Sequence, residues 1–203
     1  MHPAESWRLF VAITVPEAIR RQIESLQNSW RSVLPGTAVR WTKADQLHLT
    51  LKFLGDLETS RVNELIQALR HSAQSSAPME LAAQGAGVFP NLRCPRVLWV
   101  GIQDAEGVLP VLHQSIDAAV SGFGRSESSG PFAGHITLGR LRDDARFISS
   151  LVTDLVAKAG EKKFGQWTTR SIELFRSELS PEGARHTQVA ELALGTPPAR
   201  RLQ

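Results

Sequence analysis

Cysteine, tyrosine and long apolar runs are what this sequence has least of. Only one of its 203 residues is a cysteine, Cys94, and none is a tyrosine. A single cysteine excludes an intramolecular disulfide and a cysteine-based zinc cluster. The apolar run near the N-terminus, residues 9–15, is interrupted by Thr14 and closed by Pro16, so it is too short for a membrane span or a signal peptide core. We therefore expect a cytoplasmic protein that does not enter a membrane.

An excess of one charge is also missing. Lys and Arg number 23 against 20 Asp and Glu, which gives a formal net charge of +3. This mildly basic balance, without a dense Lys/Arg block, permits a polyanionic substrate but argues against a purely electrostatic nucleic-acid binder. The length and the hydrophobic fraction of 42% suffice for one domain with a substantial core.

Strands and amphipathic helices are predicted to alternate along the chain. Apolar residues at helical spacing mark four helices, and β-branched or alternating segments mark the strands between them. The longest predicted strands cover residues 8–15, 47–55, 79–89, 96–102, 164–176 and 186–194. A Gly/Ser-rich loop over residues 121–131 precedes a strand at 135–141, and a helix from about 144 to 158 follows it. We expect residues 1–6 to be loose and residues 196–203 to form a disordered tail.

Two of these strands carry the same pattern, His48-Leu49-Thr50-Leu51 and His135-Ile136-Thr137-Leu138. In a strand, residues i and i+2 lie on one face, so each motif presents its histidine and threonine together, opposite its apolar residues. In the first motif this alternation predicts Leu47, Leu49, Leu51 and Phe53 on the core face. It places Lys52 on the histidine face, where a lysine near a strand end is usually solvated.

The motifs lie 135 − 48 = 87 residues apart, and a helix follows each. This repeated order predicts an internal duplication and an α+β fold. We expect two pseudo-symmetric lobes, each an antiparallel sheet with helices outside, around a central groove that carries both motif strands. Residues 1–195 would form a single bilobal domain.

Two imidazoles facing each other across a groove suit a reaction that needs an acid and a base. An unperturbed pKa near ~6.5 lets one ring be neutral while the other is protonated. Phosphodiester cleavage needs this division of labour, with threonine hydroxyls as donors to phosphoryl oxygens and without a metal. Either motif alone is more often structural, since 6 histidines and 11 threonines give about 0.3 His-x-Thr matches by chance. The pair, placed alike in two strands, favours the functional interpretation.

The segments HLTLKFLG and HITLGR resemble the paired HxTx motifs of the two-histidine phosphoesterases. The closer resemblance is to the RNA 2′,3′-cyclic phosphodiesterases, also called 2′-5′ RNA ligases. It extends to RLFVAITVP near the N-terminus, GVFPNLRCPRVLWVGI in the centre and LFRSELSPEGARHTQVAELAL near the C-terminus. It therefore covers nearly the whole chain.

The resemblance implies hydrolysis of a 2′,3′-cyclic phosphodiester to a 2′-phosphomonoester. It implies His48 as proton donor and His135 as proton acceptor, with Thr50, Thr137 and Arg140 binding the phosphate. The substrate would be RNA with 2′,3′-cyclic phosphate ends or small cyclic nucleotides. Apart from the resemblance, we expect a monomer by default, and the acid–base scheme uses no cofactor or metal. Sequence spacing does not say which imidazole is the acid. Strict alternation also places Arg140 opposite His135, so Arg140 reaches the groove only if the strand ends or twists at Gly139.

One departure from the family and several alternatives stay open. Where the family often has a tyrosine after the glycine of its closing turn, this chain has His186, which we expect to be a surface strand residue. We expect Phe10, Trp41, Phe53 and Phe89 to serve packing rather than base stacking. The alternatives are 2′-5′ joining of RNA ends at the same site and a non-catalytic RNA- or nucleotide-binding module. A metal site on the two histidines is disfavoured because neither motif has a carboxylate or cysteine.

Overall fold

A computed structural model describes residues 5–123, 131–142, 148–180 and 183–195. The expected tail at 196–203 and residues 1–4 of the expected loose N-terminus lie outside these ranges. So do residues 124–130 of the Gly/Ser-rich loop and residues 144–147 at the expected start of the fourth helix.

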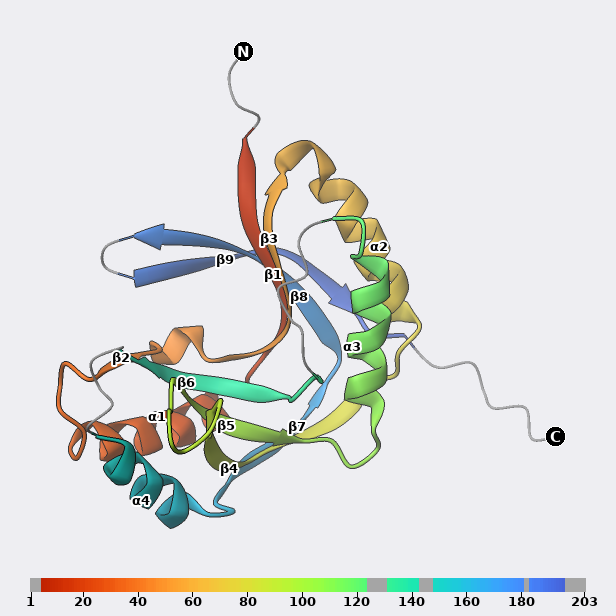
Figure 1. Ribbon diagram of the computed structural model, residues 1–203. Coiled ribbons are helices and arrows are strands. Elements are labelled where there is room, and N and C mark those ends of the chain that lie inside the picture. The colour runs from red at the N-terminus through yellow and green to blue at the C-terminus, as the bar shows by residue number, and fades with distance from the viewer. Residues whose placement is uncertain (1–4, 124–130, 143–147, 181–182, 196–203) are drawn as a thin grey trace.

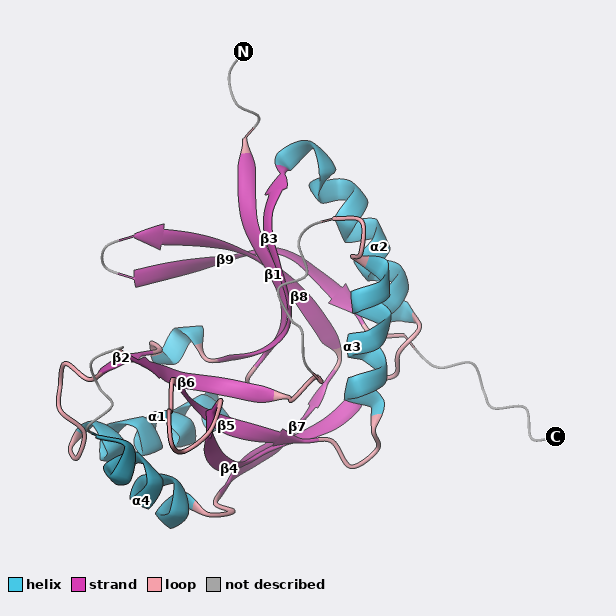
Figure 2. Cartoon of the chain, in the orientation of Figure 1, coloured by secondary structure: helices cyan, strands magenta, loops and turns pink. Residues whose placement is uncertain are grey.

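The described strands form one nine-stranded antiparallel sheet that curls strongly (Figure 2). Its order is β7-β4-β5-β6-β3-β1-β8-β9, and β2 pairs with β6 beside this path. The strands are β1 (Ser6–Thr14), β2 (Val39–Trp41), β3 (His48–Glu58), β4 (Met79–Phe89), β5 (Val97–Gln103), β6 (His135–Leu141), β7 (Lys163–Thr169), β8 (Ser171–Ser180) and β9 (Gly183–Ala193). The single strand expected over 164–176 is thus wrong: the chain turns at Arg170, and β7 and β8 lie in opposite halves of the sheet.

Four α-helices cover the sheet: α1 (Glu17–Arg31), α2 (Val62–Gln74), α3 (Val108–Ala119) and α4 (Ser149–Ala159). Short 3₁₀ turns, η1 (Ala44–Gln46) and η2 (Thr59–Arg61), precede β3 and α2. In α4 the buried face starts from Ile148 and runs through Val152 and Leu155, whereas Leu151 is exposed. None of the helices in the described ranges is long and apolar enough to cross a membrane.

Two hydrophobic clusters divide the molecule into lobes. The first lobe packs α2 and α3 against β1, β3, β8, β9 and the start of β4, where Met79 and Leu81 are buried. The second packs α1 and α4 against the rest of β4, β5, β6 and part of β7. Figure 1 shows the helix pairs on separate sides of the curled sheet. The expected two-lobed α+β fold is confirmed.

The sheet order is symmetric about the contact between β6 and β3. Moving outward from that contact, β5, β4 and β7 on one side correspond to β1, β8 and β9 on the other. Each lobe contains a helix that follows a strand of the other lobe. Helix α1 follows β1 of the first lobe but packs in the second, and α3 follows β5 of the second lobe but packs in the first. The arrangement matches the expected internal duplication.

A β-bulge in β3 changes which side chains its two faces carry. Pairing with β1 passes from Val11↔Lys52 to Ala12↔Thr50, which leaves Leu51 as an extra residue. Beyond the bulge the alternation is reversed, and two expectations are therefore wrong. Phe53 is 47% exposed and approaches the Phe10 ring, while Lys52 is only 4% exposed and forms an ion pair with Asp117 of α3.

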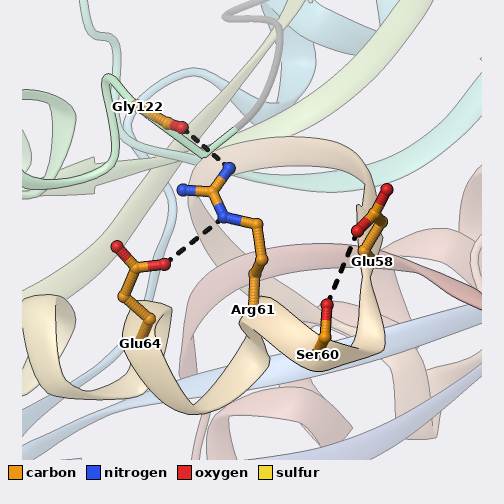
Figure 3. Close-up of polar contacts among 5 residues, drawn as sticks. All are labelled: Glu58, Ser60, Arg61, Glu64 and Gly122. Atoms are coloured by element: carbon orange, nitrogen blue, oxygen red, sulfur yellow. Dashed lines mark hydrogen bonds and ion pairs between the residues drawn. The ribbon is translucent and has the colours of Figure 1, made fainter.

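Arg61 joins the start of α2 to the segment that follows α3 (Figure 3). Its Nη1 donates to the Gly122 carbonyl at 3.1 Å, and its Nε lies 3.3 Å from Glu64 Oε2. The guanidinium also lies over the Phe123 ring, 4.7 Å from the centroid. These contacts hold the two helices of the first lobe together at one end.

Candidate active site

The two motif strands meet at the centre of the sheet, where Leu49 of β3 pairs with Ile136 of β6. In an antiparallel pair the sum of partner numbers is constant, so this register places His48 level with Thr137 and Thr50 level with His135. Directly opposed residues share a face. Leu49 and Ile136, both 0% exposed, lie beneath the helices, and all four polar motif residues are half-buried on the opposite face. The structure therefore brings the two predicted histidine–threonine pairs together.

Both imidazoles are held in the same way by the chain that precedes them. His48 Nδ1 lies 2.7 Å from the Gln46 carbonyl oxygen, and His135 Nδ1 lies 2.7 Å from the Ala133 carbonyl oxygen. Because a carbonyl oxygen only accepts, each Nδ1 carries the proton and donates it. Each neutral ring therefore has its lone pair on Nε2. Such a ring is a base as it stands and an acid only after it gains a second proton.

Burial lowers the proton affinity of both rings. Desolvation, reinforced by the neighbouring His186 and by His135, lowers the pKa of His48 from 6.5 to about 4. Desolvation, reinforced by the charge of Arg140, also lowers the pKa of His135, and the hydrogen bond to Ala133 opposes this. Without a bound anion, both rings are therefore mainly neutral at pH 7.

An aromatic cluster surrounds His48. Phe10 is 2% exposed, and its ring centroid lies 4.9 Å from His48, 5.3 Å from Phe175 and 4.9 Å from His186. The His186 ring is 5.6 Å from the His48 ring, edge to face. The expectation that His186 is only a surface residue is wrong. No pattern in the sequence indicates that Phe175 lies at the site. Its place follows from the pairing of β8 with β1, which joins residues far apart in the chain.

The surroundings of His135 come from the second lobe. The Phe89 ring lies 4.9 Å from His135 in a T-shaped contact and 5.2 Å from Trp99, which pairs with Thr137. Phe89 thus packs as expected, but against a motif histidine. Trp41 is half-buried and carries the Arg31 guanidinium on its ring at 5.4 Å.

Arg140 reaches the histidine face because β6 has a bulge at the position equivalent to that in β3. Pairing with β5 passes from Leu98↔Gly139 to Trp99↔Thr137, so Leu138 is the extra residue. The bulge reverses the alternation and turns the exposed Arg140 to the side of His135, whose pKa its charge lowers. Arg140 in β6 corresponds to Phe53 in β3, since each lies five residues after its histidine.

Polar side chains, among them the buried Glu173, fix the strand ends beside His48. Thr14 is the β1 partner of His48, and its N and Oγ1 donate to Glu173 Oε2 at 2.9 and 3.2 Å. The other oxygen of Glu173 accepts from Ser171 Oγ at 2.7 Å. The Gln46 side chain donates to the Ala184 carbonyl and so joins the turn before His48 to the β8–β9 hairpin. None of these residues was indicated by the sequence pattern.

The motif threonines keep their hydroxyls available for a ligand. Within the described ranges no hydrogen-bond partner is recorded for the side chain of Thr50 or Thr137. Nor do three His, Cys, Asp or Glu side chains gather anywhere in those ranges so that they could hold a metal ion. The arrangement offers two Nε2 atoms, two hydroxyls and one guanidinium on one face of the sheet, a set that suits an anionic phosphoryl group.

The sequence matches the family model described as LigT like Phosphoesterase over residues 13–99. It is 31% identical to the RNA 2′,3′-cyclic phosphodiesterase of Archaeoglobus fulgidus over 178 residues, which are 87% of this chain and 94% of the relative. It is 30% identical to the protein of the same name from Thermus thermophilus over 193 residues, with 92% and 90% covered.

Solved structures show the same likeness. The crystal structure of LigT from E. coli in complex with 3′-AMP superposes with a TM-score of 0.70 at 28% identity, covering 95% of this chain and 100% of that one. A crystal structure of a Thermus thermophilus protein gives a TM-score of 0.73 at 30% identity, covering 92% and 97%. Sequence and fold likeness therefore extend over nearly the whole chain.

Proposed function

Because this chain belongs to the family of LigT-like phosphoesterases, we propose that it hydrolyses the 2′,3′-cyclic phosphate ends of RNA, or small cyclic nucleotides, to 2′-phosphomonoesters. The observation that carries the proposal is the register of β3 with β6. It puts His48 beside Thr137 and Thr50 beside His135 on one face of the sheet. The relatives of this chain are named for the same reaction.

In the proposed reaction the two imidazoles act in opposite directions. His135 Nε2 takes a proton from water, and the water oxygen bonds to phosphorus. The bond from phosphorus to O3′ breaks, and protonated His48 donates its Nε2 proton to O3′. The pair ends with its one proton on His135, and exchange with solvent returns it to His48. Since each Nδ1 is hydrogen-bonded to a carbonyl, Nε2 is the atom that each ring has for proton transfer.

Phosphate binding solves the difficulty that the lowered pKa of His48 creates for a proton donor. The cyclic phosphodiester is an anion, and an anion beside an imidazole favours its protonated form. The hydroxyls of Thr50 and Thr137 and the guanidinium of Arg140 would hold the non-bridging oxygens, where negative charge builds up in the transition state. The donor is therefore charged mainly when substrate is in place.

We further propose that the reaction needs no metal ion, since acid, base and phosphate donors are all side chains of this chain. The protein would act in the cytoplasm as a monomer. Residues 1–195 would work as one bilobal domain, because the two motifs come from different lobes and are joined by one sheet.

The proposal is tested by product analysis on an oligonucleotide with a 2′,3′-cyclic phosphate end, in excess EDTA. The expected product is the 2′-phosphomonoester, with rates lowered about 10²- to 10⁴-fold in His48→Ala and in His135→Ala, the usual contribution of acid–base catalysis. His71→Ala, an exposed histidine of α2, is the matched control. A 3′-phosphate product would mean that O2′, and not O3′, is the leaving oxygen, and would overturn the roles given to His48 and His135. Full activity in either motif mutant would refute the mechanism.

A further inference from the structure

A cavity adjoins His48 on the side of β1, β8 and β9, away from β6. Its volume is about 230 Å³, and its walls include Arg20, Asp45, Gln46, Phe175, Arg185 and His186. His135, Thr137 and Arg140 do not line it, so it lies next to the space between the two motifs. The volume is below the roughly 300–1,000 Å³ of pockets that enclose drug-sized ligands, and it suits one substituent of a larger substrate.

The charges of this cavity favour an anion. Arg20 of α1 and Arg185 of β9 face a single carboxylate, that of Asp45, and neither arginine has an ion-pair partner recorded among the described residues. Arg20 Nε and His186 Nδ1 are buried without a hydrogen-bond partner there. Buried polar groups normally have partners, so both side chains have hydrogen-bonding capacity to spare. An arginine fork fits phosphate oxygens in particular.

An aromatic base fits the cavity less well. Phe10 is 2% exposed, and its ring already contacts His48, Phe53, Phe175 and His186. The cavity therefore has little free ring surface on which a base could stack, whereas stacking is what holds unpaired bases in most sites.

The direction of the proposed reaction points the substrate toward this cavity. If His48 protonates O3′, the ribose that bears O3′ lies on the His48 side of the phosphorus. The groups attached to that ribose then extend further in the same direction. In an RNA chain one of them is the phosphodiester on the 5′ side of the terminal nucleotide.

We propose that the cavity formed by Arg20, Arg185 and His186 binds this upstream phosphodiester, so that the enzyme prefers the end of an RNA chain to a free cyclic mononucleotide. The inference rests on the proposed function and deepens it, because it names the class of substrate. Free 2′,3′-cyclic mononucleotides lack the 5′-phosphate and leave the cavity without an anion.

The test compares kcat/KM for adenosine 2′,3′-cyclic phosphate with kcat/KM for the dinucleotide ApA ending in a 2′,3′-cyclic phosphate. The wild type should prefer the dinucleotide, and the ratio should fall about tenfold or more in Arg20→Met and in Arg185→Met, as expected for a lost charge-assisted hydrogen bond. Arg21→Met is the matched control, since Arg21 is the next residue of α1 and its side chain is 73% exposed. Urea unfolding of each variant establishes that it is folded before its ratio is used.

A third substrate separates the phosphate from the extra nucleoside. Replacing the ApA linkage with a neutral methylphosphonate should abolish the preference in the wild type. A preference that survives the neutral linkage, or a ratio unchanged in both arginine variants, overturns the inference. Equal turnover of mononucleotide and dinucleotide overturns it as well but leaves the proposed function intact. That function fails if neither substrate is hydrolysed.

Discussion

At the motif histidines, burial shifts to lower pH the range in which the two rings together hold a single proton. Desolvation lowers the pKa of both rings, that of His48 to about 4. Above both pKa values the acid has lost its proton, and below both the base is blocked by one. We expect a bell-shaped pH profile of kcat/KM centred below pH 6.5, falling about tenfold per pH unit on its alkaline side.

The profile of kcat should lie at higher pH than that of kcat/KM, because kcat reports the complex, in which the phosphate anion raises the pKa of both imidazoles. Initial rates from pH 4 to 9 at low and at saturating substrate measure the two profiles. An optimum of kcat/KM at pH 7 or above would contradict the lowered pKa values.

His186 contributes to the low pKa of His48, after desolvation. Its own pKa is lowered by desolvation and raised by Asp45, so it gains charge at acid pH, where His48 titrates. His186→Asn removes that charge and should raise the pKa of His48 from about 4. The pKa is measured as the midpoint of the NMR titration curve of the His48 Cε1 proton. His71→Asn, on the outer face of α2, should leave the His48 titration in place. An unchanged or lower pKa of His48 in His186→Asn would contradict this role.

At the scale of the strand, period-two alternation predicted the histidine face of both motifs correctly and failed after the fourth residue of each. Leu51 and Leu138 are extra residues in their ladders, and each reverses the faces that follow. A leucine fits an in-register position as well as a bulge, so the sequence offers no local signal for either. Alternation alone left open whether Arg140 reaches the histidine face, and the bulge at Leu138 turns it to that face.

The long-range parts of the site were the least predictable. His186 reaches His48 because β9 pairs with β8, β8 with β1 and β1 with β3, and each pairing depends on the whole sheet. The chain divides residues 164–176 into β7 and β8 at Arg170, where no glycine or proline indicates a turn. Pairing between distant segments is set by packing of the complete core, which periodicity in a single segment does not contain.

The bulge in β3 also directs Lys52 to Asp117 of α3, and this pair gives a test at the element scale. Lys52 is 4% exposed and Asp117 is 48% exposed. Asp117→Asn leaves a buried ammonium without this carboxylate and should lower the free energy of unfolding by about 1–3 kcal/mol, less than for a fully buried pair. Glu17→Gln breaks the exposed pair with Arg21 and should cost about 0.5 kcal/mol or less.

Urea unfolding at pH 7 compares these two variants, and acid provides a second check. The ion pair with Lys52 lowers the pKa of Asp117, so its stabilisation is present above the ordinary aspartate pKa and is lost as the pH falls through the lowered one. The difference between wild type and Asp117→Asn should therefore shrink in acid. Equal costs for the two substitutions at pH 7 would show that the buried pair contributes no more than the surface one.

At the scale of the whole molecule, the two lobes are related as the repeated element order predicted, yet they exchange parts. The polypeptide crosses between the lobes after β1, before β3, at β4, after β5, before β6 and between β7 and β8. A continuous sheet joins the lobes at Leu49 and Ile136. Two lobes that share helices and a sheet are expected to unfold as one cooperative unit, although each has its own hydrophobic cluster.

This cooperativity is tested by removing core volume from one lobe and observing the other. Leu65 of α2 and Ile23 of α1 are both 0% exposed and belong to different clusters. Leu65→Ala and Ile23→Ala should each lower the free energy of unfolding by about 2–5 kcal/mol. Native-state hydrogen exchange should report the same loss for the most protected amides of both lobes, because opening either lobe removes helices that cover the other. If Leu65→Ala lowered protection in the first lobe alone, the lobes would be separate folding units, and the register that aligns His48 with Thr137 would depend on how two independent bodies dock.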